Sequence, residues 1–268
     1  MAAPSRVWQR LAAAADGPRE VVHYGAAALY VDLDGGPAGC LGLVAAPATR
    51  VPCALWSGLP DLRSLAGRPV HLVGGTLVVG DETVRVTRLV DVRLPRRVAP
   101  RGPGVPAMVA GRPGDREPER PDPLTSDLAD LGELPADGRL TASDVERLVG
   151  RGPGLTPLGD DVLAGWLAVR AAAGEVDLRV ADAVRRALGA TTSLSATLLD
   201  CALHGEALPE LARWLTTRGT ADEATAEVAL LAVGASSGAG LLAGARLALA
   251  SLETPVDHST HDHPGRVA

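Results

Sequence analysis

The sequence predicts an α+β protein, in which a mostly antiparallel β region precedes a helical region. Apolar and polar residues alternate in the first part of the chain, which is typical of strands, and turn residues separate these runs. After a proline-rich stretch, apolar residues recur at helical spacing. The chain has 268 residues, 46% of them hydrophobic, which is enough for a sizeable core. The predicted divisions are 1–94 (β-rich), 95–140 (linker or long loop), 141–252 (helical, ligand-binding) and 253–268 (a disordered, His-rich tail).

The β-rich region is predicted from alternation and turns. Leu29, Val31 and Leu33 share one face of an extended segment, with Tyr30 and Asp32 on the other, which predicts a half-buried strand. The other elements predicted here are a helix at 5–15 and strands at 40–44, 77–79, 83–87 and 89–94. The predicted turns are 34–37, 74–75 and 80–81.

The segment after this region is predicted to be a linker. Repeated prolines between 95 and 138 forbid regular structure. Its first part is basic, so an RNA-binding arm is conceivable, but no aromatic residue is present there to stack on bases, and a solvated linker is favoured. The basic residues concerned are Arg96, Arg97, Arg101 and Arg112. A net charge of −6 gives no general attraction to nucleic acid or to an anionic membrane.

Helices are predicted through most of the remainder. The residues 143–146 are a plausible cap for a short helix that ends at Gly150. Further helices are predicted at 157–173, 178–188, 193–204, 207–217, 221–232 and 237–251. The weakly charged run 228–250 contains a glycine- and serine-rich break, so it predicts two buried helices and a loop rather than a membrane span.

Residue usage excludes several kinds of chemistry. Every basic residue is arginine, so lysine Schiff bases and the lysine-containing phosphate-binding loop are excluded. Cys40, Cys53 and Cys201 are far apart and odd in number, which disfavours a disulfide framework or a zinc site and favours a reducing cytoplasm. The apolar run at 11–15 is too short for a signal peptide.

The segment 150–161 carries the strongest functional signal. We expect Thr156 to cap a helix and Pro157 to occupy its first position, while the glycines let the backbone turn and approach a ligand. Such a helix start favours anions, and Arg151 can either contact an anion directly or remain a solvated loop residue. The candidate binding residues here are Arg151, Gly152, Gly154, Thr156, Gly159, Asp160 and Asp161.

Two more helix starts have the same design. Each has more hydroxyls and glycines than a cap needs, although capping alone is the simpler explanation for any one of them. If the helices bring the three starts together, their N–H and O–H donors form a pocket for a phosphate or a carboxylate. The additional candidate residues are Thr191, Thr192, Ser195, Ser236, Ser237 and Gly238.

Asp160 and Asp161 leave several roles open. They can complement the helix dipole, at about 0.3–1 kcal/mol each. They can instead hold Mg²⁺ that bridges to an anion, or accept hydrogen bonds from N–H groups of the ligand. A ligand with an anionic end and an amide or ureido end would satisfy the whole set.

Other candidates have simpler structural explanations. Cys201 and His204 are one helical turn apart, but a buried cysteine beside a satisfied histidine is favoured over a nucleophilic pair. Arg246 lies in an apolar helix and needs a carboxylate or a ligand nearby. The tail histidines have only loose metal-ligand spacing; they are His258, His261 and His263.

At its three helix starts the chain resembles the oxamate carbamoyltransferase subunit family, long filed as a domain of unknown function. The first matching segment is GPGLTPLGDD at 152–161 with LAG at 163–165. The second is TTSLS at 191–195 with Ala202 and Gly205, and the third is SSG at 236–238 with LAG at 242–244. The family usually has Ser where Leu158 stands, and often an acidic residue near Ala239.

The resemblance implies a subunit of a hetero-oligomeric enzyme of allantoin breakdown. That enzyme transfers a carbamoyl group from oxalurate to phosphate, giving oxamate and carbamoyl phosphate. The Ser-Thr-Arg-Thr-Arg phosphate motif of common carbamoyltransferases is absent from this sequence, so catalytic groups can lie on partner chains. Two alternatives remain: a non-catalytic anion-binding or assembly subunit, and an Mg²⁺-dependent hydrolase that uses Asp160 and Asp161.

Overall fold

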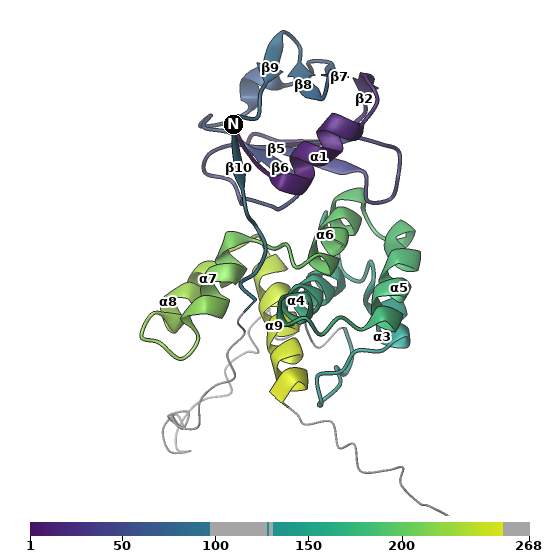
Figure 1. Ribbon diagram of the computed structural model, residues 1–268, viewed down its shortest axis with the longest axis vertical. Coiled ribbons are helices and arrows are strands. Elements are labelled where there is room, and N and C mark those ends of the chain that lie inside the picture. Colours follow the sequence, from purple (N-terminus) through teal and green to yellow (C-terminus); the bar gives the residue numbers. More distant parts are fainter. Residues whose placement is uncertain (97–127, 129–130, 254–268) are drawn as a thin grey trace, which may run out of the picture.

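The computed structural model describes residues 1–96, 128 and 131–253. Strands gather at one end of the molecule and helices at the other, with the long helix α4 near the centre of the helical part (Figure 1). The predicted α+β architecture is therefore confirmed. Most of the predicted solvated linker, including the arginines beyond Arg96 that made an RNA-binding arm conceivable, and the predicted disordered tail from residue 254 on lie outside the described residues.

The β region contains two sheets and one helix, α1 (Ser5–Ala13). A six-stranded sheet has the order β10-β1-β6-β5-β4-β3, and a four-stranded sheet has the order β2-β7-β8-β9. Neighbouring strands are antiparallel except the pairs β1–β10 and β5–β6. The strands are β1 (Ala2–Pro4), β2 (Gly17–Arg19), β3 (Val21–Tyr24), β4 (Ala28–Asp32), β5 (Cys40–Val44), β6 (Ala54–Trp56), β7 (Val70–Val73), β8 (Thr76–Val79), β9 (Glu82–Val84) and β10 (Arg88–Val90).

The expectation that the strand around Tyr30 is half-buried is wrong. Tyr30 is only 8% exposed, and its neighbours Leu29 and Val31 are buried as well. One face of the large sheet packs on α1 and the second sheet, and the other packs on the helices, since Tyr30 belongs to the same core cluster as α4. When both faces of a sheet are covered, side chains on both faces are buried, so the alternation of buried and exposed residues along the strand disappears.

The predicted strand at 89–94 is also too long. β10 ends at Val90, and the following backbone leaves the sheet to bond with the connection between two helices. The Leu94 N–H donates to the Gly205 carbonyl, and the Ala207 N–H donates to the Val92 carbonyl, at 2.8 and 3.0 Å. The predicted strand at 83–87 likewise ends early, at Val84.

Seven helices form the described C-terminal part. Six of them start and end within two residues of their predicted bounds. The bounds are α3 (Ala142–Leu148), α4 (Leu158–Ala173), α5 (Leu178–Ala187), α6 (Ser193–Leu203), α7 (Pro209–Thr217), α8 (Glu223–Leu231) and α9 (Ser237–Glu253). Within the described residues, no helix combines the length and apolar character that crossing a membrane requires.

The start and end of α3 differ from the prediction. Its N-cap is Thr141, whose hydroxyl accepts from the Asp144 N–H while the Asp144 carboxylate accepts from the Thr141 N–H. The residues 143–146 therefore lie inside the helix rather than at its cap. The helix ends at Leu148, before Gly150, which adopts a φ of 71° and begins the next loop.

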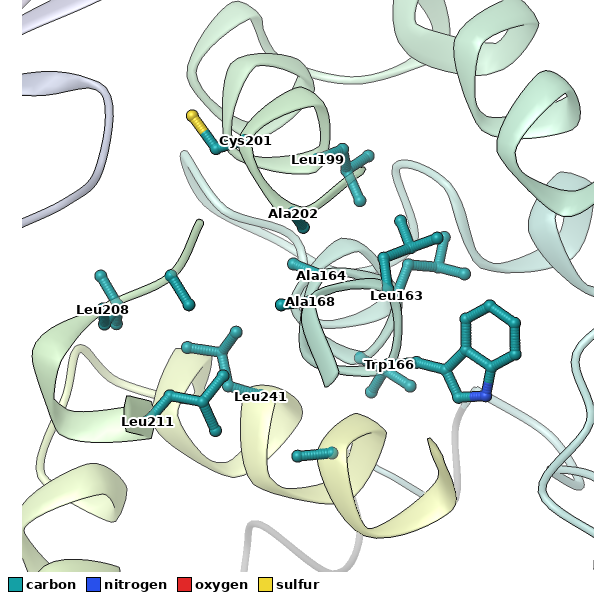
Figure 2. Close-up of a cluster of buried hydrophobic side chains, with 14 of the residues drawn as sticks. Leu163, Ala164, Trp166, Ala168, Leu199, Cys201, Ala202, Leu208, Leu211 and Leu241 are labelled. Atoms are coloured by element: carbon teal, nitrogen blue, oxygen red, sulfur yellow. The ribbon is translucent and has the colours of Figure 1, made fainter. Parts of the chain in front are cut away.

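Close packing of α4 on α9 builds the helical core. Trp166 projects from one side of α4, and Ala164 from the side that faces α6 (Figure 2). The two helices cross where both carry glycine: a Cβ at Gly165 would overlap the Leu241 carbonyl oxygen, and a Cβ at Gly244 would overlap that of Val162. The indole N–H of Trp166 also donates to the Gly138 carbonyl at 2.9 Å, so the end of the predicted linker packs on this core.

Candidate functional site

The three hydroxyl-rich helix starts meet beside the N-terminus of α4. The hydroxyls of Thr156 and Ser237 are 2.8 Å apart and share a hydrogen bond between the first start and the third. The Thr192 hydroxyl donates to the Leu155 carbonyl at 2.5 Å, which joins the first start to the second. Segments separated by up to 81 residues in sequence are therefore in direct contact.

The α4 terminus is not built as predicted. Pro157 occupies the N-cap position, and the helix begins at Leu158. Thr156 does not cap it, because its hydroxyl is used in the contact with Ser237. The N–H of Gly159 donates to the Arg151 carbonyl at 2.8 Å, so this helix end offers fewer free donors than the sequence predicts.

The loop before α4 turns as its glycines predict. Gly152 and Gly154 have φ values of 115° and 95°, in the region that favours glycine. Gly152 also lies against the backbone of Leu158, where a Cβ would approach the backbone nitrogen to 2.9 Å. Arg151 is exposed on this loop.

Asp160 is a structural carboxylate. It is 1% exposed and accepts three hydrogen bonds: from the Gly150 N–H at 2.8 Å, and from the Thr191 and Ser195 hydroxyls at 2.5 and 2.7 Å. Because both of its oxygens are used, Asp160 ties the loop after α3 and the start of α6 to α4. Two of the predicted binding residues, Thr191 and Ser195, direct their hydroxyls to it.

The Thr192 side chain also caps α6. Its hydroxyl accepts from the Ser195 N–H at 3.1 Å, which confirms the capping role weighed for this segment. Ser237 is the first residue of α9, and Ser236 and Gly238 flank it. Gly238 packs against the end of α8, where a Cβ would overlap the Leu230 carbonyl oxygen.

Asp161 has the opposite environment. It is 5% exposed, and its Oδ2 atom has no hydrogen-bond partner among the described residues. Burial raises the pKa of its carboxyl well above the ordinary value; a hydrogen bond from Ser237 opposes this rise, and the charge of Asp160 adds to it. A buried, unpaired acceptor is costly, so such a group is a candidate for contact with a ligand.

Asp161 lines a cavity of about 230 Å³ between the helices and the large sheet. Its walls come from α4, α6, the α6–α7 connection, the start of α9, β4 and the loop after β5. Ala164, Ala202, Leu208 and Leu241, which line it, surround the space between α4, α6 and α9 in Figure 2. The polar side chains in its wall are Tyr30, Thr49, Thr156, Asp161, Glu206 and Ser237.

Of the predicted binding residues, only Thr156, Asp161 and Ser237 line this cavity. Tyr30, Thr49 and Glu206 also line the cavity, and the sequence did not indicate them as binding residues. Tyr30 and Thr49 come from the β region, and no local pattern indicates that they reach a site built by helices more than 100 residues away. Glu206 directly follows Gly205, one of the residues that carry the family resemblance, so the sequence weakly indicated that this position is near the site.

Glu206 is the second carboxylate of the cavity. It is 6% exposed and pairs with the Arg6 guanidinium of α1 at 3.0 Å. Burial raises the pKa of Glu206, and the charge of Arg6 opposes the rise. Arg6 also contacts Asp200 at 2.5 Å, so it fixes Glu206 between the β region and α6.

The remaining candidates have structural roles. Cys201 is buried, which raises the pKa of its thiol, and the His204 ring nitrogen Nδ1 bonds to the Asp200 carbonyl at 2.7 Å rather than to the thiol. Arg246 pairs with the Glu227 carboxylate at 2.6 Å, which confirms the expectation that this arginine has a carboxylate or a ligand nearby.

A metal site would need further ligands. In residues 1–96, 128 and 131–253, no group of three or more His, Cys, Asp or Glu side chains is arranged to hold a metal ion. Mg²⁺ at Asp160 and Asp161 stays a prediction, and the hydrogen bonds on both oxygens of Asp160 do not favour it.

Comparison with known proteins points to one family. The family model of the oxamate carbamoyltransferase subunit AllH matches residues 148–249, which contain all three helix starts. No curated protein matches the chain, and no solved structure does. The part of the chain from the end of α3 into α9, which contributes most of the residues that line the Asp161 cavity, therefore resembles the oxamate carbamoyltransferase subunit AllH.

Proposed function

We propose that this chain is a subunit of an oxamate carbamoyltransferase and that the cavity beside Asp161 binds a carbamoyl-bearing substrate. The reaction is carbamoyl transfer between oxalurate and phosphate, a step of allantoin and purine breakdown. The support is that the matched family range and the converging helix starts coincide.

One observation carries the proposal. Asp161 presents a buried Oδ2 atom without a partner to a cavity that all three helix starts help to build. Oxalurate and carbamoyl phosphate both carry N–H groups that would donate to this oxygen. Binding would thereby satisfy an acceptor that is otherwise left unpaired.

The phosphate requires positive charge from elsewhere. No arginine or histidine is among the described residues that line the cavity. Transferring phosphoryl or carboxylate charge into such a site is unfavourable without a cation or strong donors. This composition of the cavity supports a hetero-oligomer in which other subunits complete the active site.

We also infer a cytoplasmic location, because Cys40, Cys53 and Cys201 are free thiols, as is usual in a reducing compartment.

Ligand binding by the isolated chain tests the proposal. Calorimetry with oxalurate, oxamate, carbamoyl phosphate and phosphate should detect binding of at least one carbamoyl compound by the wild type. Asp161→Ala should bind it more weakly, whereas Asp182→Ala, on the exposed face of α5, should match the wild type. If no carbamoyl compound binds, or if Asp161→Ala binds equally well, the assignment of this cavity is wrong.

Turnover distinguishes the catalytic proposal from the non-catalytic alternative. With partner subunits present, the complex should form carbamoyl phosphate from oxalurate and phosphate. A complex of equal activity that contains the Asp161→Ala chain would assign this chain to assembly rather than to the reaction.

A further inference from the structure

We propose that the cavity accepts the uncharged carbamoyl end of a ligand and excludes carboxylate and phosphate ends, with Asp161 as the residue that makes this selection. The inference rests on the proposed function for the identity of the natural substrate. The selection itself rests on the composition of the cavity.

The described wall of the cavity offers no positive charge to an anion. Its two ionisable carboxyl groups, Asp161 and Glu206, are 5% and 6% exposed, and no arginine or histidine is among the described residues that line the cavity. Glu206 already has Arg6 as its partner at 3.0 Å, and Arg6 is not part of the wall. An anion would be desolvated here without a compensating charge.

The cavity is large enough for a small ligand. At about 30 Å³ for each water in the liquid, a volume near 230 Å³ corresponds to roughly seven or eight water molecules. Most of the wall is apolar, including Leu194, Leu198 and Leu241. Few polar groups therefore determine how a ligand is oriented.

The polar groups match the edge of an amide. Asp161 offers the unpaired Oδ2 as an acceptor. Ser237 donates to the Asp161 carboxyl and accepts from Thr156, whose oxygen is 2.8 Å away, so both of these hydroxyl hydrogens are used. Tyr30 and Thr49 add hydroxyls to the same wall, and a hydroxyl can donate to a carbonyl oxygen. A carbamoyl group has both an N–H donor and a carbonyl acceptor on one edge, whereas a carboxylate has acceptors alone.

The state of Asp161 selects against a cation, because a neutral carboxyl does not attract positive charge. Burial raises the pKa of this carboxyl, which favours the protonated form. A protonated carboxyl can donate through its O–H and accept through its other oxygen, so it can make two hydrogen bonds to one amide. Asparagine has nearly the same shape and the same pair of functions, and is therefore the conservative replacement.

Three isosteric probes test the charge selection directly. Acetamide, acetate and acetamidinium share one planar skeleton and a methyl reporter, and they are neutral, anionic and cationic respectively. Saturation-transfer NMR on the full chain should show acetamide bound and acetate not bound. Bound acetate, or acetamidinium bound in preference to acetamide, would overturn the inference.

Variants locate the selection at Asp161. Asp161→Asn should keep acetamide binding within about threefold, while Asp161→Ala should lose about tenfold or more, the size expected for one or two hydrogen bonds. Asp182→Ala is the matched control on an exposed surface. Circular dichroism checks that each variant is folded, and equal binding by folded Asp161→Ala would refute the role of this residue.

The same experiment separates this inference from the proposed function. Oxamate has one carbamoyl end, and oxalate replaces it with a second carboxylate. If acetamide binds but oxalurate and oxamate do not, the selection stands and the carbamoyltransferase proposal fails. If oxalurate binds and oxalate competes with it as well as oxamate does, the function stands and the selection fails.

Discussion

Removing the Asp160 carboxylate should destabilise the fold more than any ordinary surface substitution. Asp160→Ala leaves three groups without their acceptor: the Gly150 N–H and the hydroxyls of Thr191 and Ser195. The site is 1% exposed, so water cannot readily replace the lost oxygens. The same change also separates the loop after α3 from the start of α6.

The magnitude follows from the three contacts. Hydrogen bonds to a charged group contribute about 1.5–3 kcal/mol each, so three sum to roughly 4.5–9 kcal/mol. Bonds to one shared acceptor are not additive, and the loop can relax toward solvent. We therefore expect Asp160→Ala to lower the free energy of unfolding by about 3–5 kcal/mol, a large part of the 5–15 kcal/mol that is typical of folded proteins.

Equilibrium urea unfolding, followed by circular dichroism, measures this change. Asp182→Ala serves as the matched control, because Asp182 pairs with Arg185 on an exposed helix face and its loss should change stability by less than about 1 kcal/mol. The loss of unfolding free energy in Asp160→Asn should lie between those of Asp160→Ala and Asp182→Ala. The asparagine keeps one oxygen to accept from the Gly150 N–H, while its NH₂ group faces the Thr191 and Ser195 hydroxyls, which can rotate to accept from it.

The reasoning has a clear failure condition. If Asp160→Ala unfolds within about 1 kcal/mol of the wild type, the three bonds do not stabilise the fold as described. A double-mutant cycle with Ser195→Ala should also show coupling of about 1 kcal/mol or more. Coupling near zero would mean that the Asp160–Ser195 hydrogen bond contributes nothing.

Three further outcomes are expected. Because burial raises the pKa of Asp161, the native state holds a proton that the unfolded chain releases near pH 3.9, so stability falls as pH rises from that value toward the native pKa. Urea unfolding should show Asp161→Asn gaining stability relative to the wild type as the pH rises above about 4.5, and a constant difference between the two would contradict this. Gly244→Ala should cost about 1–3 kcal/mol, because its Cβ would overlap the Val162 carbonyl, whereas Gly189→Ala, with open space around it, should be neutral or slightly stabilising; equal unfolding midpoints would contradict the packing argument. The three buried thiols should resist a thiol reagent at pH 8 until urea unfolds the chain, since burial raises the pKa of Cys40 to about 12; rapid native labelling would contradict this.

The helices could be predicted because each carries its own signals. A run such as 178–188 combines an N-terminal Asp177, an apolar stripe and arginines in its last turn, and α5 occupies Leu178–Ala187. The Asp177 carboxylate indeed accepts from the backbone N–H groups of the first turn. Such local information does not depend on where the rest of the chain lies.

The short strands could not be predicted in the same way. Five strands without a matching prediction have three or four residues each, too few for alternation to stand out. β1 is held by neighbours distant in sequence, since Ala3 pairs with Leu89 of β10. Pairing of this kind is a tertiary property.

The candidate site, like the fold, could be predicted only in part from the sequence. The sequence indicated that residues 150–161, 191–195 and 236–240 start three helices with more hydroxyls than capping needs, and the structure brings them into contact. It gave no basis for separating Asp160 from Asp161. Successive helical residues point about 100° apart, so one carboxylate is surrounded by donors and the other lines the cavity.

By itself the sequence determined the α+β class, the positions of the helices and the family that the helical half resembles, because these depend on periodicity, capping residues and local motifs. Only the tertiary structure decided which side chains face the cavity. Tyr30, Thr49 and Glu206 meet Asp161 there because the large sheet is covered by helices on its second face, and that packing depends on contacts between residues far apart in the chain.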